Sequence, residues 1–243
     1  MTSVELVLPV LNEERNISRS TRRLHEYMTT NLAAYEWKIV IADNGSTDST
    51  PAIALQLTKD LTCVDYLRIE QRGRGRALKT AWLHSNSDIL GYMDIDLSTE
   101  LEAIPKLVRS IESDDYDLSI GSRLKKGAVV IGRSQIREFI SRSYNLLIKG
   151  MFFNRFHDAQ CGFKAISRNA ALNLLPSVQD KTWFFDTELL LLAENAGYRI
   201  DEIPVTWTDD PDSRVNITKT AWTDFKGLLR LRFGGLKRVS KER

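Results

Sequence analysis

The segment from residue 89 to residue 98 is Ile89-Leu90-Gly91-Tyr92-Met93-Asp94-Ile95-Asp96-Leu97-Ser98. Its first five residues are apolar and uncharged, which is typical of a short buried strand. Asp94 and Asp96 follow at the strand end, and residues two apart in an extended segment point the same way. Two carboxylates so placed repel each other unless a cation lies close by, which favours a hard divalent ion with oxygen ligands. The structural alternative is that Asp94 ends the strand and Asp96 caps a helix that starts near Leu101.

Strand and helix patterns alternate on both sides of this segment. Apolar runs predict further strands at residues 4–10, 37–43, 64–69 and 118–122, with helices between them. Asn12 is the expected cap of the first helix, which should end near Leu32. This alternation predicts an α/β fold with a mostly parallel sheet and helices on both faces.

The pattern changes after Arg123. A long helix is expected from Ser134 to Phe153, with an apolar stripe made of Ile136, Ile140, Tyr144, Leu147 and Met151. A short strand at 163–166 and helices at 168–175 and 185–196 should follow, then an extended segment at 200–207. Residues 221–243 alternate basic and apolar side chains, so the chain should close with amphipathic helices.

Charge and cysteine content bound the class of protein. The net charge of +2 is uneven: residues 219–243 hold eight basic and two acidic side chains, so the other 218 residues are net acidic. A basic end on a mildly acidic body indicates an anionic surface as partner, and no nucleic acid is expected. Cys63 and Cys161 give no disulfide framework and fit a reducing compartment.

Targeting and membrane signals are weak in this sequence. No stretch approaches the roughly 18 apolar residues that a spanning helix needs. The first strand carries Glu5 and Pro9, which do not suit an export signal. We therefore expect a chain that is soluble as it stands, or that lies on a membrane surface without crossing it.

Three other predicted strand ends carry polar, acidic or glycine-rich tips. They are residues 9–13, 43–46 and 72–75, and with Asp94 and Asp96 they would line one edge of a parallel sheet. A nucleotide requires such a set. Carboxylates accept hydrogen bonds from a base or ribose, while cations and a metal neutralise a diphosphate.

The order of these motifs resembles that of family 2 glycosyltransferases with the GT-A fold. The matching segments are Leu8-Pro9-Val10-Leu11-Asn12-Glu13, Asp43-Asn44-Gly45-Ser46-Thr47-Asp48-Ser49-Thr50, Gly73-Arg74-Gly75-Arg76-Ala77 and Asp94-Ile95-Asp96. Ile120-Gly121-Ser122-Arg123 extends the resemblance to the branch that glycosylates polyprenyl phosphates. Residues 158–164 and 183–189 resemble dolichyl-phosphate beta-glucosyltransferases more than the related dolichyl-phosphate mannose synthases. The resemblance runs from about Val4 to Arg214.

The resemblance implies a role for each matched residue. The nucleotide side would comprise Pro9, Asn12, Glu13, Asp43, Arg74 and Asp94, with Arg74 standing where the family usually has lysine. Asp94 and Asp96 would hold Mg²⁺ or Mn²⁺ on the diphosphate, and Asp96, Arg123 and Arg137 would be the catalytic residues. The acceptor side would comprise Gln160, Lys164, Asp186, Glu188 and Arg214, where Arg214 also replaces a lysine. Asp186 and Glu188 are equally compatible with ordinary positions in a helical turn.

The function implied is an inverting transfer of a hexose to a polyprenyl or dolichyl phosphate at the cytoplasmic face of a membrane. UDP-glucose is the expected donor, and transfer of mannose from GDP-mannose is the alternative. A second alternative is a non-catalytic nucleotide-sugar-binding subunit of a membrane complex. A transmembrane partner and a homodimer are both left open. A nucleotidyltransferase is disfavoured, because no glycine-rich phosphate loop follows the first strand.

The resemblance also divides the chain. Residues 1–218 would form the GT-A catalytic domain, with a nucleotide-binding half at about 1–123 and an acceptor-binding half at about 124–218. Residues 219–243 would form a basic amphipathic segment at the C-terminal end.

Overall fold

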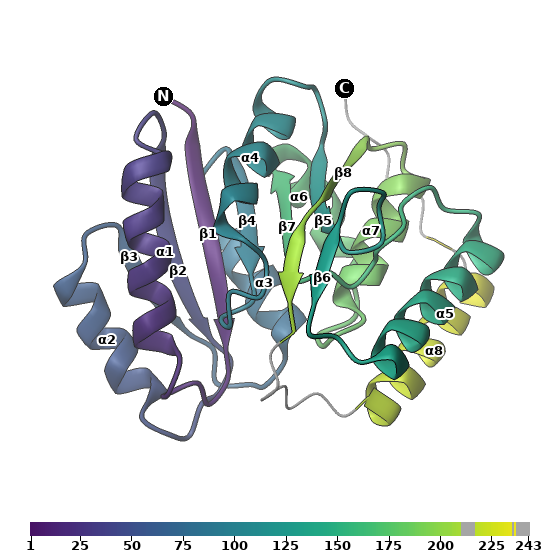
Figure 1. The fold of residues 1–243 in the computed structure, drawn as a ribbon, viewed down its shortest axis with the longest axis horizontal. Coiled ribbons are helices and arrows are strands. Elements are labelled where there is room, and N and C mark those ends of the chain that lie inside the picture. Colours follow the sequence, from purple (N-terminus) through teal and green to yellow (C-terminus); the bar gives the residue numbers. More distant parts are fainter. Residues whose placement is uncertain (210–216, 235, 237–243) are drawn as a thin grey trace.

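One sheet organises the molecule (Figure 1). The computed structural model describes residues 1–209, 217–234 and 236. Within these residues the sheet has seven strands in the order β3-β2-β1-β4-β7-β5-β8. They are β1 (Ser3–Val10), β2 (Glu36–Asp43), β3 (Val64–Arg68), β4 (Ile89–Met93), β5 (Leu118–Ser122), β7 (Phe163–Ser167) and β8 (Ile200–Pro204).

The sheet is parallel except for one strand. β1 pairs in parallel with β2 and with β4, and β5 pairs in parallel with β8. β7 runs antiparallel between β4 and β5. The predicted α/β class with a mostly parallel sheet is therefore confirmed, and the carboxyl ends of β1, β2 and β4 meet at one edge.

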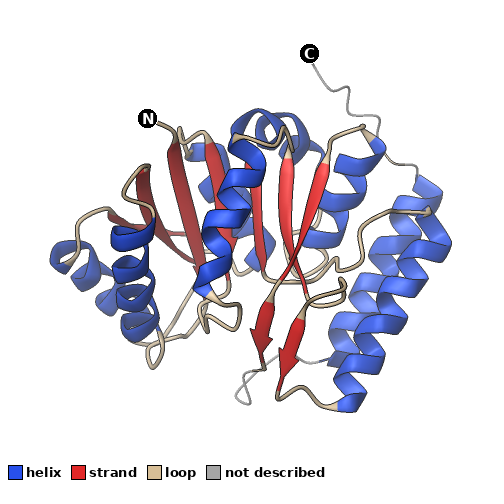
Figure 2. Ribbon diagram, turned by 45° about the horizontal axis from the view of Figure 1, so that its top comes forward, coloured by secondary structure: helices blue, strands red, loops and turns tan. Residues whose placement is uncertain are grey.

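Helices cover both faces of the sheet (Figure 2). α1 (Ile17–Asn31), α2 (Thr50–Asp60) and α4 (Ile104–Glu112) share one buried cluster with Leu6 and Leu8, while α3 (Arg74–His84), α6 (Arg168–Leu174) and α7 (Phe185–Asn195) share the other with Val7. Alternate residues of β1 thus enter opposite clusters, as the two-residue period of a strand requires.

The C-terminal half adds a small sheet and a pair of helices. β6 (Val129–Ile131) pairs in parallel with β9 (Thr206–Thr208), and Trp207 of β9 forms an antiparallel bridge with Thr99. α5 (Gln135–Phe152) lies beside α8 (Ile217–Gly234), as both views show. α8 runs across the predicted boundary at residue 218, and its Leu228 and Leu231 are buried in the larger body.

The prediction for Asn12 was wrong. The first helix begins at Ile17, and Asn16 occupies its cap position. Asn12 instead has φ of 56° and lies in the loop after β1. Asparagine tolerates this left-handed conformation better than most residues, so the polar side chain serves a turn here and not a helix start.

The predicted apolar stripe of α5 is divided: Tyr144 and Met151 pack against the buried cluster that contains Ile148, whereas Ile136, Ile140 and Leu147 are exposed. The buried residues of this helix are Ser141, Asn145 and Ile148. Among the large apolar side chains, Ile136, Phe139 and Leu146 are each 72% exposed, and Phe153 just after the helix is 83% exposed. No helix in the described part of the chain is long and apolar enough to cross a bilayer.

Candidate active site

The loops after β1 and β2 interlock at the edge predicted for the nucleotide. The Asn12 amide donates to the Ser46 hydroxyl at 2.9 Å, and the Asn12 side-chain oxygen accepts from the Thr47 amide at 2.8 Å. The Glu13 amide donates to the Thr50 hydroxyl at 2.8 Å. Pro9, buried in β1, pairs with Ala42 of β2. The structure therefore brings together the loop residues that the sequence placed on the nucleotide side.

Asp43 is buried beneath these loops. Its carboxylate accepts hydrogen bonds from the Ser46 amide at 2.8 Å, Tyr66 at 2.9 Å and Arg68 at 2.7 Å. Burial by itself raises the pKa of Asp43, but the hydrogen bonds from Ser46, Arg68 and Tyr66 outweigh it and lower that pKa. Burial, and then the hydrogen bond to Asp43, raise the pKa of Tyr66 to about 12. An ionised Asp43 thus fixes the loop, and its contact with a nucleotide base stays a prediction.

Arg74 lies at the centre of the candidate site. Its Nη2 and Nε donate to one oxygen of Asp94 at 2.6 and 3.2 Å, and its Nη1 donates to Asp186 at 2.7 Å. The guanidinium carbon lies 4.7 Å from the ring centre of Tyr92 and 5.0 Å from that of Trp183. Arg74, predicted on the donor side, therefore joins Asp94 directly to a residue predicted on the acceptor side.

Asp186 and Lys164 form the buried floor behind Arg74. Asp186 accepts from Tyr92 at 2.5 Å, and the Lys164 ammonium lies 3.3 Å from the same carboxylate. Burial raises the pKa of Asp186, but the charges of Lys164 and Arg74 outweigh it and hold that pKa below its usual value. Both side chains are almost fully buried. Asp186 holds Arg74 directly and Lys164 pairs with Asp186, while the contact of either residue with an acceptor stays a prediction.

Asp94 and Asp96 stand at the end of β4, as predicted. Asp94 is partly exposed and Asp96 is exposed. The Asp96 carboxylate accepts from the Ser98 amide at 2.9 Å, and Leu97 turns the chain with φ of 52°. The next helical turn, Leu101–Ala103, has Glu100 at its cap position, so the alternative that Asp96 caps it does not hold.

Gly162 fixes the position of Asp94. The Asp94 amide donates to the Gly162 carbonyl at 3.0 Å. A Cβ atom at residue 162 would lie 1.7 Å from one Asp94 carboxylate oxygen, which no side chain permits. Only glycine therefore lets the Asp94 carboxylate occupy this place.

Asp94 and Asp96 fit a metal ion that takes some of its ligands from the protein and the others from a substrate. Among the described residues, no three His, Cys, Asp or Glu side chains gather into a metal site. Asp94 and Asp96 offer hard oxygen ligands, which Mg²⁺ prefers together with substrate phosphates and water. A divalent ion would accordingly be held by these two residues and by a nucleotide diphosphate.

Arg123 forms a two-pronged ion pair with the carboxylate of Asp158. Its backbone amide, Nε and Nη2 donate to Asp158 at 3.0, 2.8 and 2.8 Å. Asp158 is 0% exposed, and burial alone raises its pKa. The charge and hydrogen bonds of Arg123 outweigh that effect and lower the pKa of Asp158 to about 2. The Asp158 amide in turn donates to Glu202 at 3.0 Å, so the guanidinium is rigidly placed.

Arg137 reaches the same region from α5. Its Nη1 donates to both oxygens of Asp209 at 2.9 Å, and its backbone amide donates to the Ser134 hydroxyl that caps the helix. Asp209 follows β9, whose Trp207 lies 5.4 Å from the guanidinium carbon of Arg123. The two predicted catalytic arginines thus converge on β9, although their contact with substrate is a prediction.

The remaining acceptor-side candidates fasten α8 to the body. Gln160 donates to Asp224 of α8 at 2.6 Å, and Glu188 forms a two-pronged pair with Arg230 of α8 at 2.9 Å. Glu188 is buried, and Asp224 is buried enough that its pKa is raised to about 7. Arg214 lies outside the described residues.

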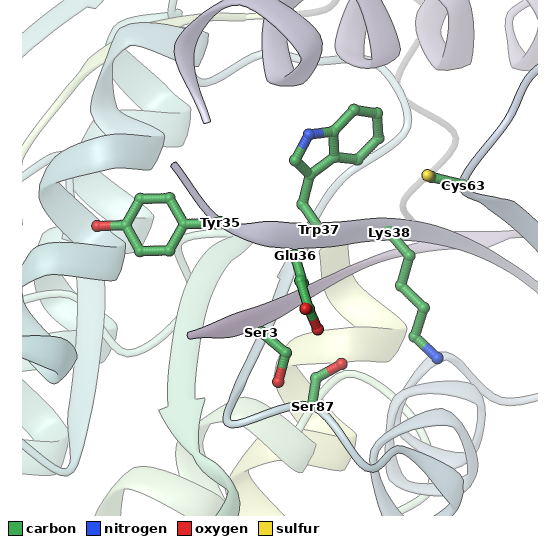
Figure 3. Close-up of a pocket in the computed structure, with 7 residues that line it drawn as sticks. All are labelled: Ser3, Tyr35, Glu36, Trp37, Lys38, Cys63 and Ser87. Atoms are coloured by element: carbon green, nitrogen blue, oxygen red, sulfur yellow. The ribbon is translucent and has the colours of Figure 1, made fainter. Parts of the chain in front are cut away.

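A surface depression of about 420 Å³ lies at the other end of the sheet. Figure 3 shows its lining, which is Ser3, Tyr35, Glu36, Trp37, Lys38, Cys63 and Ser87. It includes none of the predicted site residues, and it borders the amino ends of β1 and β2. Ligands of open α/β sheets bind at the opposite, carboxyl ends, so the site described above is the better candidate.

Comparison with known proteins gives consistent matches. Residues 5–175 match the model of the family "Glycosyl transferase family 2". The chain is 36% identical to glycosyltransferase AglD of Haloferax volcanii over 89% of this chain and 35% of that protein, so it spans about a third of that relative's length. It is 28% identical to the dolichyl-phosphate beta-glucosyltransferase of Saccharomyces cerevisiae over 98% of this chain and 77% of that protein.

Solved structures share the fold. The glucosyl-3-phosphoglycerate synthase of Mycobacterium tuberculosis, solved with Mn²⁺, UDP-glucose and phosphoglyceric acid, superposes with a TM-score of 0.71. The match has 18% sequence identity and covers 96% of this chain and 80% of that one. The same enzyme has also been solved with Mg²⁺ and UDP, at a TM-score of 0.67. The likeness confirms the predicted GT-A architecture.

Proposed function

The chain belongs to glycosyl transferase family 2, and from this premise we propose that it transfers glucose from UDP-glucose to a polyprenyl phosphate with inversion at the anomeric carbon. The proposal rests mainly on two carboxylates and two arginines that lie close together at one edge of the sheet. Asp94 and Asp96 stand on the nucleotide side, and Arg123 and Arg137 converge on β9 beside them. The relatives named dolichyl-phosphate beta-glucosyltransferase support the choice of sugar and acceptor.

The donor occupies the edge formed by the loops after β1, β2 and β4. Asp94 and Asp96 hold the divalent ion, which neutralises charge on the departing diphosphate when bound. Arg74 keeps the Asp94 carboxylate in one orientation through its contacts with Asp94 and Asp186. We place the donor in the half at about residues 1–123 and the acceptor in the half at about residues 124–218, with Arg123 at the boundary serving the acceptor.

The acceptor phosphate is bound by Arg123 and Arg137. A phosphate monoester is largely ionised near neutral pH, since its second pKa is about 6. Its oxygen is thus already nucleophilic, and no strong general base is required. The two arginines orient that oxygen behind the anomeric carbon, and in-line attack breaks the bond to the diphosphate and inverts the configuration.

Transfer requires that the enzyme meets a lipid. A polyprenyl chain does not leave the bilayer cheaply, because each CH₂ exposed to water costs about 0.8 kcal/mol. The exposed apolar side chains of α5, together with Trp222 and Phe233 of α8, lie on two neighbouring helices. We propose that α5 and α8 insert these side chains into the cytoplasmic surface of a membrane. A transmembrane partner and a homodimer stay predictions.

The donor assignment is tested by transfer to a short-chain polyprenyl phosphate in detergent. We expect UDP-glucose with Mg²⁺ or Mn²⁺ to give a β-linked glucosyl phosphate, and a chelator to abolish it, because an ion held by Asp94 and Asp96 would neutralise charge on the diphosphate. The measurement is radiolabel transfer with NMR of the anomeric proton. If the chain transferred a sugar from GDP-mannose and not from UDP-glucose, the proposed donor would be wrong and the enzyme would be a mannosyltransferase. Binding of UDP-glucose without turnover under any metal would support the non-catalytic subunit instead.

The membrane surface is tested by sedimentation with vesicles that contain anionic lipid. Leu146→Glu should weaken binding about ten- to a hundredfold, since burying a leucine contributes about 1.5–3 kcal/mol. Leu55→Glu is the matched control, because Leu55 is an exposed leucine on α2 at the far side of the sheet. Equal binding of both variants and the wild type would remove α5 from the membrane surface.

A further inference from the structure

Two guanidinium groups contact one indole beside the catalytic edge. The guanidinium carbon of Arg123 lies 5.4 Å from the ring centre of Trp207, and that of Arg133 lies 5.6 Å from it. Trp207 is bridged to Thr99, and the next residue, Thr208, donates its amide to the Ser98 carbonyl at 2.8 Å. The indole therefore contacts both arginines, and the strand that carries it pairs with the segment that follows Asp96.

Arg133 is not used by the mechanism given above, yet it is nearly buried. Its side chain is 10% exposed, and its Nη1 donates to Glu138 at 3.0 Å. Its Nε is buried and has no hydrogen-bond partner within the described part of the chain. Such a donor normally finds an acceptor, so the unmet Nε indicates a missing partner with a lone pair.

Charge points to the nature of that partner. Burial, and then the positive charge of Arg123, lower the pKa of Arg133. The guanidinium groups of Arg123 and Arg133 repel each other because both contact the Trp207 ring. An anion bound by both groups would relieve that repulsion. The nearby carboxylates already have partners, because Asp158 pairs with Arg123 and Asp209 pairs with Arg137.

Within the described residues, the carboxylate that forms an ion pair with Arg133 is Glu138. Binding of an anion by Arg133 would therefore change the pairing of Glu138. Its second oxygen accepts from Arg142 at 2.6 Å. Arg133 can therefore release Glu138 without leaving that carboxylate alone. A dianion with several oxygens competes well for a guanidinium, since such charge-assisted bonds are the strong ones.

We propose that Arg133 is a third guanidinium of the acceptor-phosphate site, and that Trp207 aligns Arg133 and Arg123 on the same phosphate dianion. This inference rests on the proposed function and adds a specificity-determining residue to it. It explains how a phosphate monoester is selected over an uncharged alcohol. An uncharged alcohol would bring no negative charge to the two neighbouring arginines, although it could still meet a single donor.

The test compares Arg133→Ala and Arg133→Lys with the wild type. Two readouts are needed: the KM for donor and acceptor in the transfer assay, and calorimetric binding of a short polyprenyl phosphate in the presence of UDP. Loss of a hydrogen bond to a charged group should raise the acceptor KM and Kd about tenfold or more. The donor KM should stay unchanged. Arg133→Lys should recover part of the acceptor affinity, because the charge remains and the planar fork does not.

Arg142→Ala is the matched control. It removes the other arginine on Glu138, and it does not contact Trp207 in the described structure. We expect wild-type acceptor KM and Kd for this variant. Equal effects of Arg133→Ala and Arg142→Ala, or an equal rise of donor and acceptor KM, would overturn the inference and leave Arg133 as a helix-end contact.

Failure of the proposed function has a different signature. A wild-type chain that binds UDP-glucose and the polyprenyl phosphate but transfers nothing would contradict the enzyme. The binding arm would still decide the role of Arg133. A wild-type chain that binds no polyprenyl phosphate at all would contradict both.

Discussion

Replacing Asp96 with asparagine should lower kcat/KM about a hundred- to a thousandfold while the fold stays intact. The expected size is that of removing one electrostatic contact to charge that develops in the transition state. Asp96 is exposed at a strand end, and an asparagine oxygen can still accept the hydrogen bond from the Ser98 amide. The lost negative charge weakens the hold on the divalent ion. Steady-state transfer over a range of Mn²⁺ concentrations, with thermal unfolding alongside, measures both effects.

Asp65→Asn provides the control for this variant. Asp65 is an exposed carboxylate on β3, away from the loop that carries Asp96, and its loss should leave activity and the unfolding temperature unchanged. Near-normal activity of Asp96→Asn at every Mn²⁺ concentration, limiting ones included, would show that Asp96 does not hold the ion. A large fall in its unfolding temperature would instead make Asp96 a structural residue.

Arg123→Ala should damage stability and catalysis together. Asp158 is fully buried, and without Arg123 it becomes an uncompensated charge, which costs about 3–5 kcal/mol. For a chain of this size each kcal/mol lowers the unfolding temperature by about 2–4 °C. The variant should also lose about a hundredfold or more in kcat/KM, because a cation on the reacting phosphate is gone. Thermal unfolding and steady-state kinetics in one buffer separate the two losses.

The pH dependence of this pair has a defined sign. The pKa of Asp158 is lowered to about 2 in the folded protein, so the pair stabilises the fold fully above the unfolded value of about 3.9. That contribution is lost as the pH falls through 2. The gap in stability between wild type and Arg123→Ala should therefore be largest at high pH and shrink as the pH falls, because burial without Arg123 raises the pKa of Asp158 in the variant and a proton then neutralises the buried charge.

A double variant isolates the catalytic part of the effect. Arg123→Ala with Asp158→Asn removes the buried charge, and it should regain much of the lost stability without regaining activity. Recovery of activity as well would mean that Arg123 serves only to neutralise Asp158. Persistent instability of the double variant would contradict the buried-charge argument.

The strand ends were predictable because each strand is a short apolar run that is followed directly by polar residues. The apolar run before Asp94 gave β4, and the polar tips after β1 and β2 gave the nucleotide edge. The Arg74–Asp186 pair was not predictable in this way, since its partners are 112 positions apart and meet only when α3 and α7 pack. The sequence motifs named both residues but assigned them to opposite sides of the reaction.

Arg133 and Trp207 illustrate a second limit. Arg133 lies just before the helix predicted from Ser134 to Phe153, Trp207 ends the extended segment predicted at 200–207, and no site role was predicted for either residue. Their contact depends on the pairing of β6 with β9, two strands of three residues whose register no short pattern specifies. The outward face of α5 shows a third limit, because an apolar stripe fits a buried face and a membrane-facing one equally well.

The Glu188–Arg230 pair has a consequence for the synthesis of this protein. The two residues are 42 positions apart, and at 5–20 residues per second Arg230 is added about 2–8 s after Glu188. During that interval the nascent chain holds the Glu188 carboxylate without the arginine that pairs with it in the folded protein. A chain that ends before residue 230 lacks that arginine for good, and it should be less stable because the buried Glu188 carboxylate has lost its ion-pair partner.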